Sequence, residues 1–325
     1  MLTFGEAWAA IGENEKPVIL LGNGFSRAWN DQIFDYSNLL SVADFGERDA
    51  EMRSLFDRFG TYDFESIARV LLSGEIVAEV YGLGDGVVHA LKTDQNVLKS
   101  ALLKAISDSH PELPSDVTQE QYFGVRGFLS KFSKIFTVNY DILMYLARNK
   151  NDIEPLNWNS DDGFRAGQLW KGYGTNQNIF FLHGGLHIYE TSSGVKKHVY
   201  GEFEGGIVGQ VRINLMKNKF PLFVSEPTYQ KKKQKIDRSP YLSYCLRELE
   251  GVNEAFFIYG HSFDENDMHI FNCVKKSRSN KIFVSIYGDE NSEGNVRVKA
   301  NALAFLNGRG RQVEFFDAST VNVWG

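Results

Sequence analysis

The chain has 325 residues, of which 43% are hydrophobic and 23% charged, so it is a folded globular protein rather than a disordered one. Its net charge of −6 disfavours a primary nucleic-acid-binding protein, and its apolar runs are too short to span a bilayer. Residues 1–12 show no secretory signal pattern, and the two cysteines, Cys245 and Cys273, are too few for a four-cysteine zinc site. A cytoplasmic setting fits these features best.

The first strong pattern is the apolar run Val18–Leu21, which ends at the sequence Gly22-Asn23-Gly24-Phe25-Ser26. The run has the length and composition of a buried parallel strand, and glycines permit a sharp turn and close backbone approach. The third glycine of the dinucleotide-binding pattern and the Lys-Ser/Thr pair of a P-loop are both missing. Two interpretations therefore remain, a phosphate-binding turn at a helix N-terminus and a plain strand-to-helix turn.

Between about residues 47 and 131 the apolar residues recur at helical spacing, which predicts helices over 51–59, 64–82, 87–109 and 119–132. We expect residues 46–132 to form a helical insertion in a domain made of residues 1–45 and 133–325.

After this insertion, strands alternate with helices. Strands are predicted at 134–138, 179–182, 220–224, 255–259, 281–287 and 312–316, and helices at 141–148, 239–249, 267–276 and 296–306. Segments 186–190 and 196–203 are predicted to pair as a hairpin. The alternation predicts an α/β fold, a Rossmann-like, mostly parallel sheet with helices on both faces.

Polar residues follow several of these strands, and the carboxyl ends of parallel strands can meet in one crevice. Asn139 could fix a sugar hydroxyl or a water, and Asp141 could accept from an amide. The alternative is that Asp141 caps the next helix and Asn139 only satisfies the turn. His183 could be a general base near neutral pH, or a buried histidine held by a backbone carbonyl. His187 lies four residues on, but glycines interrupt any helix between them, so no metal site is expected.

Two later segments carry charge. In Gly260-His261-Ser262, the glycine permits close approach and the serine can bond a phosphate, while Asp264 and Asp267 can cap the following helix. The basic run at 231–235 is interpreted as a solvated loop or helix face, with a phosphate, nucleic acid or acidic partner as the alternative contact.

The order of these motifs resembles the sirtuin-like NAD-binding family. The motifs are GxGxS after the first strand, TxNxD after the second, LHG after the third and a late GxS. The likeness covers residues 17–37 and 134–288, and it is greatest to a bacterial branch linked to antiphage defence that includes chains classed as domains of unknown function. It implies an NAD-binding Rossmann-like sheet.

The resemblance also implies roles for single residues. Asn139 and His183 match the family's catalytic residues, and Asp141 matches the aspartate that contacts the carboxamide. The expected NAD-binding residues are Gly22, Asn23, Gly24, Phe25 and Ser26 at the diphosphate, Tyr36 in a loop over the nicotinamide ribose, and Gly260 and Ser262 at a phosphate and ribose.

Two departures from the family affect the expected activity. Val138 replaces the glutamine of deacetylating sirtuins, and the zinc cysteines are missing, so deacetylation is not expected. The resemblance instead implies cleavage of NAD, as substrate and not cofactor, to nicotinamide and ADP-ribose by an antiviral-defence effector. Such an effector must be silent until triggered, so we expect a homo-oligomer or a second defence protein as partner. The alternative is a catalytically silent module that binds NAD or ADP-ribose and regulates a partner.

Overall fold

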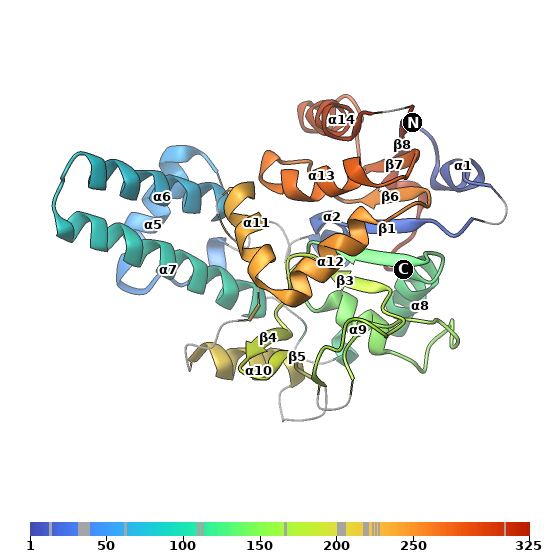
Figure 1. The fold of residues 1–325 in the computed structure, drawn as a ribbon, viewed down its shortest axis with the longest axis horizontal. Helices are drawn as coiled ribbons and strands as arrows, with labels where there is room; N and C mark the ends of the chain where they lie inside the picture. Colours follow the sequence, from blue (N-terminus) through green and yellow to red (C-terminus); the bar gives the residue numbers. More distant parts are fainter. Residues whose placement is uncertain are drawn as a thin grey trace.

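The computed structural model describes residues 1–12, 15–31, 40–61, 64–108, 111, 114–165, 168–199, 206–216, 221–222, 224, 226, 228–308 and 310–325. Its centre is a sheet of six strands, all parallel, in the order β3-β2-β1-β6-β7-β8 (Figure 1). The strands are β1 (Val18–Leu21), β2 (Lys134–Thr137), β3 (Ile179–Phe181), β6 (Phe256–Tyr259), β7 (Lys281–Ile286) and β8 (Gln312–Asp317). The predicted Rossmann-like α/β class is confirmed.

Strand β1 occupies the middle of the sheet, where Val18 pairs with Lys134 of β2 on one side and with Phe256 of β6 on the other. All four β1 residues are buried, which explains why the sequence there is continuously apolar. The chain adds β2 and β3 on one side of β1 and then returns to the other side with β6. This change of direction places a topological switch point between β1 and β6, where open α/β sheets bind their ligands.

Helices cover both faces of the sheet (Figure 1). On one face, Phe4 of the first helix packs on Phe257 of β6 with ring centroids 5.7 Å apart. On the other face, Tyr244 packs on Phe180 of β3 at 6.3 Å. The described helices are α1 (Phe4–Ala9), α2 (Asn23–Arg27), α5 (Asp49–Phe59), α6 (Phe64–Val80), α7 (Asp85–Asp108), α8 (Gln119–Leu129), α9 (Leu143–Asn149), α10 (Gly206–Met216), α11 (Tyr229–Arg238), α12 (Pro240–Glu250), α13 (Met268–Lys276) and α14 (Glu293–Leu306). Short 3-10 helices lie at Gly46–Arg48, Pro114–Asp116, Glu265–Asp267 and Ala318–Thr320.

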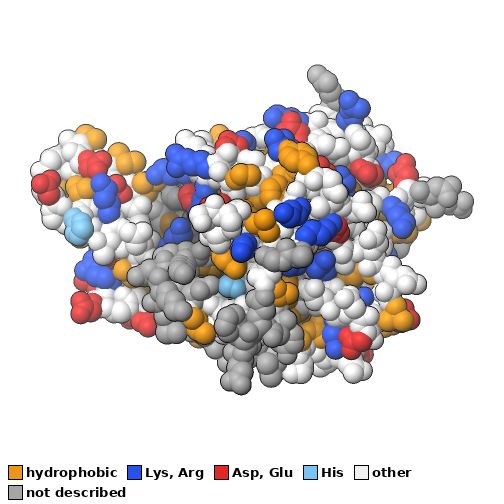
Figure 2. Space-filling view, turned by 60° about the horizontal axis from the view of Figure 1, so that its bottom comes forward, with side chains coloured by type: hydrophobic (Ala, Val, Ile, Leu, Met, Phe, Trp, Pro, Cys, Tyr) orange, Lys and Arg blue, Asp and Glu red, His pale blue; other side chains and the backbone are white. Residues whose placement is uncertain are grey.

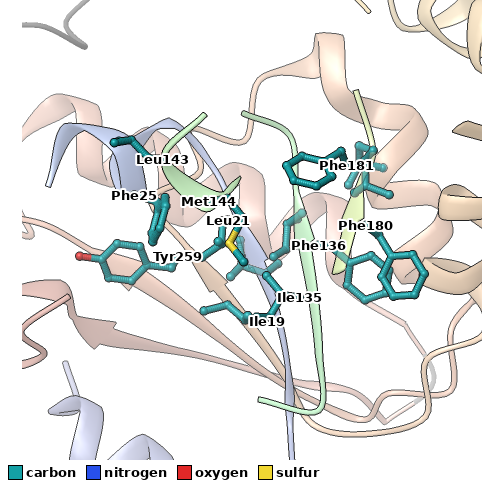
Figure 3. Close-up of a cluster of buried hydrophobic side chains, with 14 of the residues drawn as sticks. Ile19, Leu21, Phe25, Ile135, Phe136, Leu143, Met144, Phe180, Phe181 and Tyr259 are labelled. Carbon is teal, nitrogen blue, oxygen red and sulfur yellow. The ribbon is translucent and has the colours of Figure 1, made fainter. Parts of the chain in front are cut away.

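The hydrophobic core extends from the sheet into the flanking helices. Figure 3 shows side chains of β1, β2 and β3 packed with Leu143 and Met144 of α9, and Phe136 stacks on Phe180 at 4.9 Å. None of the described helices has the length and apolar character needed to cross a membrane.

Helices α5 to α8 follow β1 and precede β2, as the helical spacing predicts. Helices α6 and α7 form a hairpin that projects from the body of the molecule (Figure 1). Its free end exposes apolar side chains (Figure 2), namely Ile76, Val77, Val80, Tyr81, Leu83 and Val87. Helix α8 differs from the rest, because Phe128 packs on Tyr259 of the central sheet at 5.7 Å. The assignment of residues 46–132 to one helical insertion, separate from the sheet domain, therefore stays a prediction.

Three segments depart from the sequence expectations. The hairpin consists of β4 (Ile188–Thr191) and β5 (Gly194–Lys197), so its second strand begins two residues earlier than predicted. Helices α10 and α11 were not predicted. The strand expected at 220–224 falls partly outside the described residues, and residues 221, 222 and 224 form no strand.

Candidate functional site

A cleft of about 900 Å³ opens at the carboxyl ends of β1, β2, β6 and β7. It therefore lies at the switch point of the sheet, where the predicted motifs were expected to meet. Seven predicted site residues line it: Asn23, Gly24, Asn139, Asp141, His183, Gly260 and Ser262. Tyr36 lies outside the described residues.

Close crossing of two backbone turns explains the glycines at this end of the sheet. Gly22 N donates to Tyr259 O and Gly24 N donates to Gly260 O, both at 2.8 Å. A Cβ on Gly24 would lie 2.6 Å from the Gly260 Cα atom, and a Cβ on Gly260 would lie 2.5 Å from the Gly24 Cα atom. Gly260 also has a φ of +67°, a backbone conformation that is unfavourable for residues with a Cβ atom. The glycines are therefore required by the packing of the turns themselves.

The turn after β1 offers fewer free donors than a phosphate-binding interpretation assumes. The amide of Gly24 is bonded to Gly260, and the amide of Phe25 donates to Gly22 O at 3.0 Å. Phe25 and Ser26 are buried and do not line the cleft. Phe25 instead packs on Trp324, whose indole Nε1 donates to Phe25 O at 2.8 Å. The diphosphate role of these residues stays a prediction.

Asn139, Ser26 and Asp141 form a buried hydrogen-bond network that joins the turns after β1 and β2. Asn139 Nδ2 donates to Ser26 Oγ at 3.0 Å and to Gly22 O at 2.9 Å. Ser26 Oγ donates to Asp141 Oδ2, and Asp141 Oδ1 accepts from Leu143 N at 2.9 Å. Asp141 therefore binds the first residue of α9 from one position before the N-cap, which is Ile142. Both amide hydrogens of Asn139 are used, which leaves its Oδ1 as the atom that can meet a ligand.

His183 enters the cleft wall after β3, and its side chain is only 2% exposed. Its Nε2 atom lies 2.8 Å from Nε2 of His269 on α13, and Tyr140 stacks on its ring at 6.1 Å. Burial lowers the pKa of His183 well below 6.5, so the ring is neutral at physiological pH and is in its basic form. The alternative expectation was a buried histidine held by a backbone carbonyl. His183 is buried, but its hydrogen-bond partner is the side chain of His269.

Asp267 and Lys232 complete this cluster of buried side chains. Asp267 Oδ1 lies 3.8 Å from His183 Nε2 and 3.0 Å from Lys232 Nζ, and Asp267 Oδ2 lies 3.4 Å from His261 Nε2. Burial acts to raise the pKa of Asp267, but Lys232 and His261 hold it well below its usual range, so the carboxylate is charged.

Two sequence expectations are corrected here. Lys232, in the basic run that was interpreted as solvated, is buried with its side chain 1% exposed. Asp267 pairs with that lysine, whereas Asp264 makes the predicted cap by accepting from Asn266 N at 2.8 Å. Helical spacing could have indicated the burial of Lys232, since Ile236 lies one turn away on the same buried side of α11.

In the part of the chain that the structure describes, one group of side chains has the composition of a metal site. The ligand atoms of His183, Asp267 and His269 lie within 4.8 Å of one another. However, the ammonium group of Lys232 already neutralises Asp267 from 3.0 Å and would repel a cation placed beside the same oxygen. We therefore assign no metal ion to this group.

The strand order and the cleft define a Rossmann-like α/β protein with its candidate site at the switch point of the sheet. The chain belongs to the family described as domain of unknown function (DUF4917), whose model matches residues 19–324. No curated protein matches it in sequence. Among solved structures, it is similar to a mutant Sir2 homologue in complex with 2′-O-acetyl ADP ribose, with 13% identity, a TM-score of 0.38, and coverage of 95% of this chain and 99% of that one.

Proposed function

We propose that this protein hydrolyses NAD to nicotinamide and ADP-ribose. The observation that carries the proposal is the meeting of Asn139, Asp141 and His183 on the wall of one cleft, although Asp141 and His183 are 42 positions apart in the sequence. These are the residues that the sirtuin-like motifs single out. The cleft volume of about 900 Å³ also suits a dinucleotide, because small-molecule sites commonly measure about 300–1,000 Å³.

The proposed chemistry needs few groups. Nicotinamide is a good leaving group because it departs from a cationic ring, so the C1′–N bond breaks without a general acid. The protein must then stabilise an oxocarbenium-like ribose and deliver water. Asn139 Oδ1 would orient the ribose or the water, and Asp141 would contact the carboxamide. Neutral His183 would take the proton from the water.

The test is nicotinamide release by purified protein, measured together with NAD binding. Asn139→Ala and His183→Ala are each expected to lower the rate by about 100-fold, since a positioned base contributes about 10²–10⁴-fold. His89→Ala is the matched control. This histidine is exposed on α7 and does not line the cleft, so the variant is expected to leave nicotinamide release unchanged. A wild-type protein that binds no NAD under any condition would contradict the proposal.

One observation favours a second candidate, a module that binds NAD or ADP-ribose without turnover. His183 is only 2% exposed, so water reaches it poorly in this conformation. Binding of NAD with no nicotinamide release, by protein with intact Asn139 and His183, would support that module.

For the active enzyme, we propose a role as an antiviral-defence effector that is inactive until it is triggered. Self-association into a homo-oligomer, or a second protein, would control its activity. Expression in phage-infected cells is then expected to deplete NAD, and His183→Ala to abolish the depletion. An unchanged NAD level with the wild-type protein would contradict this role.

A further inference from the structure

We propose that His183 and His269 form a proton relay that carries the proton released in the cleft to a second cavity behind α13. This inference rests on the proposed function, because the relay needs a reaction that releases a proton next to His183. It assigns His269 as a positioning and proton-passing residue that does not itself touch the substrate.

The two histidines belong to different cavities. His183 lines the cleft at the ends of the strands, whereas His269 lines a separate cavity of about 630 Å³ between α11, α12 and α13. Their Nε2 atoms are 2.8 Å apart, which is hydrogen-bond distance, and the rings stack with centroids 5.0 Å apart. The pair therefore bridges the cleft and the second cavity through otherwise buried protein.

The hydrogen bond restricts where the ring hydrogens lie. Two facing nitrogens can bond only if one carries hydrogen and the other a lone pair. With hydrogen on His183 Nε2, the lone pair of Nδ1 is the base available to the cleft. His269 then accepts at Nε2 and carries its hydrogen on Nδ1, which is buried and has no hydrogen-bond partner among the described residues. Because His269 belongs to the lining of the second cavity, a water in that cavity is the acceptor that the relay requires for this hydrogen.

The charges around the pair suit brief protonation. Asp267 lies close to both rings, with Oδ1 3.8 Å from His183 Nε2 and the ligand atoms of all three residues within 4.8 Å of one another. Its charge favours a proton on either ring. Lys232, His261 and Lys233 oppose it, and burial lowers the pKa of His269 to about 4. A proton is therefore accepted only transiently and passed on, as a relay needs, instead of being stored.

The proton balance closes without another reactant. The C1′–N bond breaks with its electron pair on nicotinamide, a water oxygen bonds to C1′, and that water loses one proton to His183 Nδ1. The hydrogen on His183 Nε2 moves to His269 Nε2, and a water in the second cavity takes the hydrogen from His269 Nδ1 as a proton and passes it to solvent. Exchange with solvent after product release restores the first tautomers.

The second cavity leads to groups that exchange protons with solvent. Its lining includes the charged side chains Lys233, Asp237, Arg247, Glu250, Lys275 and Lys276. A proton delivered by His269 therefore reaches a cavity bordered by these charged side chains without passing back through a cleft occupied by substrate.

The test combines a conservative variant with chemical rescue. His269→Gln keeps a group that can bond His183 Nε2 but has no second ring nitrogen, so kcat is expected to fall at least about tenfold with KM for NAD nearly unchanged. In His269→Gly, added imidazole should restore kcat, whereas 1-methylimidazole, whose methyl group on one nitrogen prevents proton passage through both, should not. Asn272→Ala, which alters the lining of the same cavity, is the control and should retain the wild-type rate.

The outcomes separate the relay from the proposed function. Equal rescue by both imidazoles, or wild-type kcat in His269→Gln, would overturn the relay and leave NAD hydrolysis intact. A wild type that cleaves no NAD would instead remove the proposed function. Nitrogen-15 NMR of the substrate-free protein provides a readout without turnover: a proton shared between the two Nε2 atoms is expected, and its absence would refute the relay.

Discussion

Lys232 and Asp267 form an ion pair inside the protein, with Nζ 3.0 Å from Oδ1 and the lysine side chain 1% exposed. Asp267→Asn would leave a buried ammonium group without its counter-charge, which typically costs about 3–5 kcal/mol. We expect that loss in the free energy of unfolding, measured with urea. Adding Lys232→Met to Asp267→Asn should recover part of it, and strictly additive losses would show that the two groups do not interact.

Acid should weaken the fold through its buried histidines. Burial lowers the pKa of His198 and of His269 from 6.5 to about 4. The unfolded chain therefore binds more protons below pH 6.5, and stability that is present above that pH is lost as the pH falls toward 4. At pH 5 each histidine should cost about 2 kcal/mol relative to pH 8. Urea midpoints between pH 5 and 8 check this, and His198→Gln should reduce the slope.

The cost of a clash where the turns after β1 and β6 cross can be measured separately from the cost of a positive φ. Gly260 and Gly288 have φ values of +67° and +77°, but a Cβ on Gly288 would meet nothing within 4 Å. Gly288→Ala should therefore cost only about 1–2 kcal/mol for the left-handed conformation. Gly260→Ala adds a clash with the Gly24 backbone and should cost about 2–4 kcal/mol. Equal urea midpoints for the two variants would argue against a tight crossing.

Trp324 fixes the end of the chain against the first turn. Its side chain is buried against Phe25, to whose carbonyl it donates from Nε1 at 2.8 Å. Trp324→Ala should destabilise the protein by about 3–5 kcal/mol, because a large buried ring is lost. Trp324→Phe keeps a ring and loses the hydrogen bond, so about 1–2 kcal/mol is expected. If both variants unfold at the same urea concentration, the ring contributes little.

The sheet could be predicted from the sequence because parallel strands covered on both faces are continuous apolar runs, as at Val18–Leu21 and Phe256–Tyr259. The residues at the strand ends follow from the same logic. Seven of the predicted residues line the cleft, since parallel strands carry their carboxyl ends to one edge.

Contacts between distant segments could not be predicted. His183 and His269 lie 86 residues apart, and nothing local in either segment indicates the other. Helix α11 was missed because it buries only Lys232 and Ile236, so its apolar periodicity is weak. The engagement of the Gly24 amide by Gly260 also depends on how the two turns cross, which the spacing of residues along the chain does not show.

The last residues of the chain lie along the cleft: Asn322, Val323, Trp324 and Gly325 contribute to its wall. A purification tag or fluorescent protein fused after Gly325 would therefore start beside the candidate site and could obstruct it.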